Sequence, residues 1–587
     1  MAQNLTIQPR SVVEKALERD EQMNKLKEPW NPLYQRLGEV FLTRKASFVN
    51  TITPGQFLYD DIFNNTGEQA AFQAASIYVS MLWPDSSRVY DLRPVAELKD
   101  MPGVEETFRF WNRQMQRYMD APRAGLLMAI QEFEIDMQVF GTAGVGVFEG
   151  EDEDTPVVYE AWNVKGMKIS ENAQGFVDTI YYNDPKTVRQ VIETYGENAH
   201  PKVVDLYRQG KYDEVVKILK VIEPRSALDR GGKSGALGMR VRTLHIDIDN
   251  KHLMREKGFD EMPVNVGRAI KTMGEVMGRS NAMVALPFAC SLNALDEAIL
   301  IASEKQLDPP LGVMDDGRLG GGTIDTSAGA LNVFNASGRM TGEKPVFPLF
   351  TVGELQSAEK LREAFINSIT QAFALDRLLD LNNQTQMTAF ETSVRNRMRG
   401  EALGSMFSRQ IAEVFTPTIE RTFNILFRKG LLGTQSTGVA AVLRRAWAKV
   451  LGKELHIIPP VIQQAIDAGL DVFEVEYISP AKRFMQSEKL QGIFTAAEFF
   501  QKMAVVPGFE EIADLVDVDV MGTNVITYTG SPADMARTTT EIKSIRQGRA
   551  QAQAQAAKME AMKGASEVAR NTGSAVQSMG GQPGGQA

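Results

Sequence analysis

The sequence has 587 residues, of which 43% are hydrophobic and 24% charged, and its formal net charge is -10. This composition is ordinary for a soluble globular chain, and the length indicates several structural units. The negative charge argues against tight electrostatic binding of nucleic acid, which needs a basic footprint. The single cysteine excludes an intrachain disulfide and a thiolate zinc site.

The first 137 residues are predicted to be mainly helical. Apolar residues spaced three or four apart predict a helix from about 11 to 45, with a break at Pro32. Two further helices are predicted over 67–83 and 104–137, the first ending before a proline. The N-terminus lacks the apolar core of a signal peptide, so we expect no targeting segment there.

A β-rich region follows these helices. The runs 140–150 and 156–164 are separated by glycine and acidic residues, which indicates a meander, and 175–183 is expected to continue it. Helices are predicted again between 184 and 219, and the alternation in 239–249 predicts another strand. We find no run that approaches the ~18–20 apolar residues of a membrane span and therefore expect no membrane segment.

Two helical patterns flank an unusual insert after residue 280. In 281–307, apolar residues recur every three or four positions and predict a helix that packs along one side. Prolines 309 and 310 stop it. The segment 311–350 is rich in glycine and serine and has too little apolar mass to form its own core, so it must pack on something else. A second striped helix is predicted over 351–373.

The rest of the chain begins with a polar break at 374–386. A long helix is then predicted over 387–429, and Pro417 is expected to kink it. The C-terminal residues 546–587 start with an Ala/Gln-rich helix former that lacks an apolar face, and they end in a low-complexity tail.

No catalytic, cofactor or metal site is expected. The run 227–234 departs from a phosphate loop, because Ala227 stands where glycine is required and a strand is predicted after it. The four histidines are scattered, and no two are three to five residues apart, as a helical metal pair would require. Cys290 belongs to a striped helix and is expected to be a buried small hydrophobe.

The order of these elements resembles the core of phage portal proteins, the head-to-tail connectors of short-tailed, podovirus-type bacteriophages. The resemblance extends from about Leu17 to Leu432 and depends on several runs in the right order. Four runs are similar to the family's early helix and strand, its following hairpin, its stem helix and its long wing helix: 67–94, 140–149, 285–313 and 386–432.

The resemblance implies an α+β, predominantly helical portal fold that assembles as a dodecameric ring around a central channel. It also implies a division of the chain. The parts in order are a wing (1–280), a first stem helix (281–307), a clip (308–350), a second stem helix (351–373), a tunnel loop (374–386), the long kinked helix with the rest of the wing (387–485), a crown (486–545) and a C-terminal helix and tail (546–587).

The implied function is structural and not enzymatic, with no cofactor, metal or membrane. At one capsid vertex the ring would pass double-stranded DNA, which the terminase large subunit packages and which is later ejected. Further implied partners are the major capsid and scaffolding proteins, the tail adaptor or tail tube, and the ejection proteins. The implied location is the virion, after assembly in the host cytoplasm.

Two sets of residues are candidate functional sites on this resemblance, and both are close to charge balance, as expected for a wall along which DNA slides. The tunnel loop would face DNA, and the clip would bind the terminase, the tail adaptor and neighbouring subunits. The loop residues are Asp376, Arg377, Asp380, Asn382 and Asn383, and the clip residues are Asp315, Asp316, Arg318, Asp325, Arg339, Glu343 and Lys344.

Three other functions stay open at this point. Another ring-forming virion protein, such as a tail adaptor or an ejection protein, would share the helical content but would not need a helix–insert–helix unit. A nucleic-acid enzyme would need a phosphate loop or an acidic metal cluster. A cellular scaffold would have no channel wide enough for a duplex.

Overall fold

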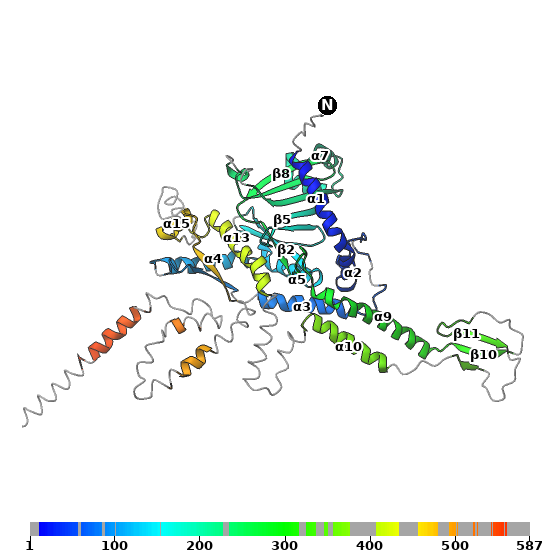
Figure 1. The fold of residues 1–587 in the computed structure, drawn as a ribbon. Coiled ribbons are helices and arrows are strands. Elements are labelled where there is room, and N and C mark those ends of the chain that lie inside the picture. Colours follow the sequence, from blue (N-terminus) through cyan, green and yellow to red (C-terminus); the bar gives the residue numbers. More distant parts are fainter. Residues whose placement is uncertain are drawn as a thin grey trace, which may run out of the picture.

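The fold consists of a mixed α+β body from which one long arm projects (Figure 1). It was obtained as a computed structural model. The structure describes residues 11–53, 55–56, 60–84, 89–99, 101–152, 154–226, 230, 234–315, 324–335, 346–349, 356–375, 407–433, 456–478, 492–499, 502, 520–522, 525, 542, 544–556 and 558–559.

The N-terminal helices confirm most of the predicted pattern. Ser11 caps α1 (Val12–Lys27) in a reciprocal capping box with Glu14. The expected break at Pro32 is wrong by a few residues: a short 3-10 turn, η1 (Glu28–Trp30), interrupts the helix. Pro32 instead lies in the first turn of α2 (Asn31–Phe41), where its missing N–H would be unpaired anyway. The 3-10 turn η2 (Thr43–Lys45) and α3 (Thr66–Leu82) follow.

The single helix expected over 104–137 is two helices, α4 (Val104–Met119) and α5 (Leu126–Phe140). A 3-10 turn, η3 (Pro122–Ala124), separates them, and Gly125 adopts φ 75° before α5 begins. A proline followed closely by a left-handed glycine ends a helix, because one removes a donor and the other reverses the backbone.

The first β-sheet is three-stranded, with β2 (Thr142–Glu149) between β3 (Val157–Trp162) and β9 (Val264–Arg268). The β2–β3 hairpin confirms the first part of the predicted meander. The expected continuation is wrong, because the second neighbour of β2 is the distant β9 and the run 175–183 belongs to another sheet. Local pattern cannot reveal which distant strand completes a sheet.

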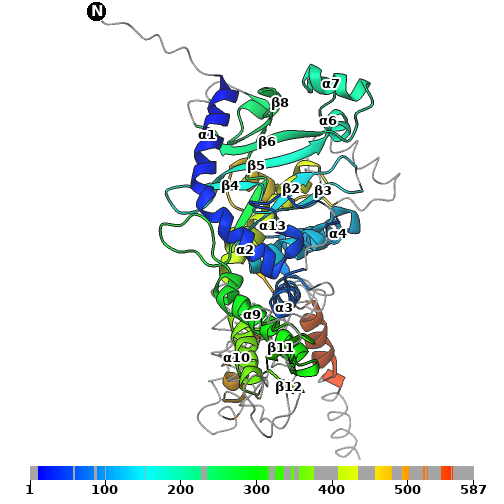
Figure 2. The same ribbon diagram turned by 90° about the vertical axis from the view of Figure 1, so that its right-hand side faces the viewer.

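The second sheet is five-stranded and antiparallel throughout. It lies between α1 on one side and α6 and α7 on the other (Figure 2). Two separate apolar clusters therefore line its faces. The strands are β4 (Met167–Glu171), β5 (Val177–Thr187), β6 (Val215–Pro224), β7 (Val241–Asp247) and β8 (His252–Phe259), and the connecting elements are α6 (Val188–Tyr195), η4 (Gly196–Asn198), α7 (Pro201–Arg208) and η5 (Gly235–Leu237).

The main core joins the N-terminal helices, the first sheet and the late helices into one apolar cluster. Trp111 of α4 is fully buried and donates from Nε1 to the carbonyl oxygen of Leu432, 2.7 Å away. The late elements are the π-helical turn η6 (Ile411–Phe415), α13 (Thr416–Arg428), α15 (Pro460–Asp467) and β13 (Phe473–Tyr477), which pairs with β1 (Tyr90–Pro94).

Candidate channel and docking surfaces

The arm is the part of the structure that corresponds to the predicted helix–insert–helix unit (Figure 1). Helix α9 (Asn281–Leu307) leads outward and confirms the predicted bounds, and α10 (Gln356–Ala372) returns beside it. A small sheet of β10 (Leu311–Asp315), β11 (Leu331–Asn335) and β12 (Val346–Pro348) lies at the far end.

A buried carboxylate ties the two helices of the arm to the body. Asp296 of α9 is 8% exposed and forms an ion pair with Arg362 of α10 at 2.8 Å. Its other oxygen accepts a hydrogen bond from Nδ2 of Asn64 at 2.5 Å. Asn293, one turn earlier, accepts from the backbone N–H of Phe63 and donates to the carbonyl of Asp61. The segment before α3 therefore clamps α9 where it leaves the body.

Helix α9 buries a narrow face of small residues rather than the predicted apolar stripe. Ala282, Ala285 and Ala289 are buried together with Leu292, and close approach of small side chains explains how α9 packs tightly on the body. Much of its apolar surface stays exposed in the single chain. The exposed residues are Val284 (56%), Phe288 (37%), Leu300 (52%), Ile301 (45%) and Leu307 (87%).

Helix α9 also corrects the expectation that no apolar run reaches membrane-spanning length. Within the described part of the chain it is the one helix long and apolar enough to cross a bilayer, with a mean hydropathy of 1.6 in its most apolar window. Length and composition are the only grounds. A single helix of this kind is weak evidence for a membrane, because helices of soluble proteins meet the same criteria.

The sheet at the end of the arm is formed by three short strands of the coreless insert. β10 is central and pairs in parallel with β11 and antiparallel with β12. Ile324, Leu331 and Val346 are 64%, 67% and 46% exposed, so the sheet buries little within one chain. Both outer strands present unpaired edges among the described residues, which makes further strand pairing possible.

Only two of the predicted clip residues lie within the described residues. Asp325 stabilises a turn: its Oδ1 accepts from the N–H and hydroxyl of Ser327 at 2.9 and 2.7 Å, and these bonds lower the pKa of Asp325. Asp315 ends β10, opposite Asn335. The other five, Asp316, Arg318, Arg339, Glu343 and Lys344, lie outside the described residues.

All five predicted tunnel-loop residues, Asp376, Arg377, Asp380, Asn382 and Asn383, also lie outside the described residues. The start of that loop is well defined, however. Phe373 and Leu375 are buried on either side of Ala374, which adopts a left-handed backbone with φ 54°. This conformation costs a non-glycine residue about 1–2 kcal/mol, and burial of its two neighbours offsets that cost. The chain therefore turns sharply at the end of α10.

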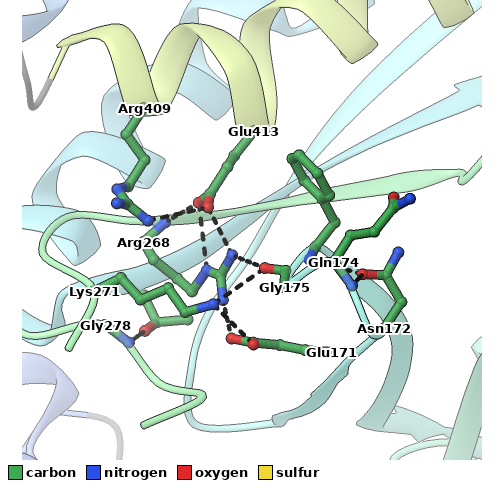
Figure 3. A network of polar contacts seen from close by, with 11 residues as sticks. Glu171, Asn172, Gln174, Gly175, Arg268, Lys271, Gly278, Arg409 and Glu413 are labelled. Atoms are coloured by element: carbon green, nitrogen blue, oxygen red, sulfur yellow. Dashed lines mark hydrogen bonds and ion pairs between the residues drawn. The ribbon is translucent and has the colours of Figure 1, made fainter. Parts of the chain in front are cut away.

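A buried ion network lies in the body, at the start of the segment that leads into the arm (Figure 3). Arg268, the last residue of β9, has a side chain that is 1% exposed. Its Nη2 contacts Oε1 of Glu413 at 2.6 Å and donates to the carbonyl of Gly175 at 2.9 Å, and its Nη1 contacts Glu171. Lys271 joins Glu171 at 2.8 Å.

This network links three parts of the chain that the sequence pattern leaves separate. Glu171 ends β4, Arg268 ends β9 just before the segment that leads into α9, and Glu413 lies in the π-helical turn η6. Sequence reasoning missed both Arg268 and Glu413, which are 145 positions apart. The one available signal was the charge at the end of β9, a strand whose five residues are all buried.

An irregular turn lies at the position of the predicted kink in the described part of the long helix. The π-helical turn Ile411–Phe415 immediately precedes α13, and Pro417 lies in the first turn of α13. Proline cannot donate to the carbonyl four residues earlier, and a wider turn accommodates this loss. Residues 387–406 of the predicted helix lie outside the described residues.

The residues considered as possible metal-binding or catalytic groups have structural roles where the structure describes them. His245 lies in β7, as predicted, and its Nδ1 is 2.8 Å from the hydroxyl of Tyr195. His200 and His252 are brought together, with ring centroids 5.3 Å apart. Among the described residues, no group of three or more His, Cys, Asp or Glu side chains could hold a metal ion. Most of the 227–234 run lies outside them.

The expectation for Cys290 is wrong in one respect. Its side chain is half-buried, not buried, and it lines a cavity of about 580 Å³ between α2, the segment before α3, and α9. Nη2 of Arg36 lies 3.6 Å from its sulfur. The side of α9 that carries Cys290 is thus turned toward this polar cavity, because the alanine face takes the contacts with the core.

Residues 13–536 match the family model of the bacteriophage head to tail connecting protein. This chain belongs to that family. Two relatives of the connector are a "Probable portal protein" of Bordetella phage BPP-1, 24% identical over 85% of this chain and 84% of the relative, and a "Portal protein" of Salmonella phage epsilon15, 23% identical over 77% and 76%.

Two solved structures are also similar to the connector chain. One is from the virion of a native gene transfer agent particle, with a TM-score of 0.30 and 13% identity over 75% of this chain and 99% of that one. The other is from the neck of an empty gene transfer agent particle, with a TM-score of 0.30 and 12% identity over 70% and 93%. At these TM-scores neither structure contributes to the assignment, which depends on the family model.

The family match confirms the resemblance drawn from the order of the elements. The protein is a portal, or head-to-tail connector, of a tailed phage, a structural component of the virion and not an enzyme. Its place is the connection between head and tail. The mixed, mostly helical fold agrees with the predicted fold class.

Proposed function

We propose that twelve copies of this chain form a ring at one capsid vertex, and that double-stranded DNA enters and leaves the head through its central channel. The main observation in support of this proposal is the exposed apolar surface of the arm. Helix α9 keeps Leu300, Ile301 and Leu307 exposed in the single chain, and such a surface is stable in water only when another surface covers it. If each copy uses this surface of α9 to contact the next copy, and the same contact repeats around an axis, the surface is covered in every copy and the assembly closes into a ring.

Within this ring, α9 and α10 are the stem, and residues 308–350 are the clip. The remaining divisions follow the sequence: wing 1–280 and 387–485, tunnel loop 374–386, crown 486–545, and C-terminal helix 546–587. The exposed strand edges of the small sheet support a clip in which neighbours complete each other's sheets and which contacts the terminase during packaging and the tail adaptor afterwards.

DNA movement through the ring depends on weak contact with the wall. The net charge of -10 disfavours persistent binding to phosphate, and in the loop the single basic residue Arg377 nearly balances the two acids Asp376 and Asp380. Packaging energy would come from a separate terminase ATPase. The capsid and scaffolding proteins would hold the wing, and ejection proteins would follow the same channel.

Ring formation is tested by electron microscopy and mass measurement of the purified chain. We expect rings with a central hole for the natural sequence and for Leu26→Asp, which places a charge on the exposed face of α1 (71% exposed). Ile301→Asp is expected to yield monomers, because it charges the apolar face of α9. Closed rings formed by Ile301→Asp as readily as by Leu26→Asp would refute the assignment of α9 to the ring interface.

The tunnel loop is tested by DNA packaging in vitro. Replacing Asp376 and Asp380 with lysine adds a basic ring to the channel, and we expect slower translocation that recovers as salt concentration rises. Asp205→Lys on the exposed surface of α7 is the matched charge control. Normal packaging by the loop variant would show that residues 374–386 do not contact DNA.

A further inference from the structure

Five polar side chains are buried together at the root of α9, where four helical segments meet. They lie within the main apolar core and are between 0% and 8% exposed. They are Tyr78 of α3, Glu134 and Gln138 of α5, Asn281 at the start of α9, and Gln410 in the helical residues 407–410 just before η6.

The hydrogen bonds of this cluster are incomplete. Asn281 Nδ2 donates to Gln138 Oε1 at 3.0 Å, and Gln410 Nε2 donates to Glu134 Oε2 at 3.4 Å. Three buried atoms have no hydrogen-bond partner among the described residues: Glu134 Oε1, Gln138 Nε2 and Gln410 Oε1. Unpaired buried polar atoms are rare in native proteins, so each calls for an explanation.

Within the part of the chain that the structure describes, no opposite charge compensates Glu134. The described groups that interact with it are neutral: Tyr78 from α3 and the amides of Gln138 and Gln410. Asn281 of α9, also neutral, interacts with Gln138 and Tyr78. Charged residues nearby in the sequence are engaged elsewhere. Asp136 pairs with Lys45, and Arg409 and Glu413 belong to the Arg268 network. An ionised carboxylate here would be buried without a cation, which is strongly unfavourable.

We propose that Glu134 is held as a neutral carboxylic acid, whose Oε1–H donates to Oε1 of Gln410 while Gln410 Nε2 donates back to Glu134 Oε2. A single proton then gives partners to two of the three unpaired atoms. The resulting cyclic acid–amide pair joins α5 to the helical segment before η6, and Gln138 extends the contact to the first residue of α9. The helices at the root of the arm are thus held together by a hydrogen bond that exists only while Glu134 is protonated.

The geometry predicts how this joint responds to pH. Burial raises the pKa of Glu134 to about 8, although the nearby amide side chains of Gln410 and Gln138 oppose the shift. The unfolded chain titrates near the ordinary value of ~4.3. Between these two pKa values the folded state therefore binds more protons than the unfolded state. The stabilisation of the fold by protonated Glu134 is complete below the unfolded pKa, and it is lost as the pH rises toward and through 8.

The first test measures the proton directly in the natural full-length chain. An infrared spectrum with ¹³C-labelled glutamate should contain a protonated-carboxyl band at pH 6 that disappears above pH 8. The band should be absent from Glu134→Gln and present in Glu132→Gln, an exposed position on the same helix. A natural chain without this band at pH 6 would overturn the proposal, and would leave a buried water as the partner of the unpaired atoms.

The second test measures the joint itself by hydrogen exchange, corrected for the intrinsic effect of pH. In the natural chain, exchange in the first turns of α9 and in 407–415 should increase on the order of tenfold from pH 6 to pH 9, as one buried hydrogen bond is lost. Glu134→Gln should remove most of this increase, because an amide–amide pair keeps two hydrogen bonds without a titratable proton. An equal increase in the variant would contradict the proposal. The infrared titration of the natural chain decides the matter even if the variant does not fold.

Discussion

Arg268 and Glu413 face each other in three contacts inside the body. Nη2 of the arginine lies 2.6 Å from Oε1, and the arginine Nε and backbone N–H donate to Oε2 at 3.4 and 3.0 Å. Arg268 ends the strand that leads toward α9, and Glu413 lies at the π-helical turn of the long helix. The pair thus joins the route into the arm to the kinked helix, and movement of one part is expected to strain the other.

Removal of one member of this pair should destabilise the chain strongly. Glu413→Ala leaves the fully buried Arg268 with one carboxylate fewer, and we expect a loss of about 3–5 kcal/mol in the free energy of unfolding. Arg428→Ala is the control, since its side chain is 40% exposed and its ion pairs are at the surface, where a loss of about 0–1 kcal/mol is usual. Urea unfolding measures both. Similar losses in the two variants would contradict a structural role for the network.

The junction of α5 and β2 should tolerate no side chain at Gly141. Its φ of 77° is left-handed, and an added Cβ would lie 2.5 Å from the carbonyl carbon of Arg279. Gly210 has φ 78° but open space around it. Gly210→Ala should therefore cost about 1–2 kcal/mol from backbone strain alone, and Gly141→Ala should cost clearly more. Thermal unfolding of the two variants tests this, and equal shifts would show that the close approach to Arg279 does not matter.

The Asp296–Arg362 pair should hold the two helices of the arm together. Asp296→Ala removes the partner of both Arg362 and Asn64, and we expect a loss of about 1–3 kcal/mol with faster hydrogen exchange along α10. Glu297→Ala, at the next and exposed position of α9, is the matched control and should change little. Unchanged exchange in α10 of the Asp296 variant would argue against this tie.

Lys27 should make stability rise with pH in the alkaline range. Burial, followed by the charges of Lys168 and Lys165, lowers the pKa of Lys27 to about 7, while its Nζ donates to the carbonyls of Val164 and Lys165. The unfolded lysine titrates near ~10.4. Between these two pKa values the unfolded state binds more protons than the folded state. The contribution of Lys27 to the free energy of unfolding therefore increases from pH 7 to pH 10 and is lost as the pH falls toward 7.

Denaturation curves at several pH values test the role of Lys27. Lys27→Met should flatten the rise between pH 7 and pH 10, whereas Lys25→Met, at an exposed position of the same helix, should keep it. If the free energy of unfolding rises just as much with pH in the Lys27 variant, groups other than Lys27 cause the rise.

The sequence predicted individual helices well where the pattern was long and regular. Residues 281–307 form one helix with the expected bounds, because periodic apolar spacing followed by two prolines is a local signal. The prediction over 104–137 was wrong where Pro122 and Gly125 interrupt a pattern that otherwise continues. A short break of this kind leaves the periodicity on either side intact.

The candidate sites were predicted less completely. Most of the clip residues and all of the tunnel-loop residues lie outside the described residues, so their roles stay predictions. The residues that the structure adds, Arg268, Glu413 and Glu134, carry no motif. Each is meaningful only because an otherwise apolar core surrounds a charged or titratable group.

Local pattern and composition were therefore sufficient for the mixed, mostly helical fold class and the coreless insert, because periodicity and turn residues are properties of neighbouring positions. The portal family came from the resemblance of several runs, in the right order, to known portal proteins, and the family match confirms it. Tertiary structure alone decided that β9 completes the sheet of β2, that alanines form the buried face of α9, and that Arg268 meets Glu413. Partners more than a hundred positions apart depend on the path of the whole chain, and no local pattern encodes that path.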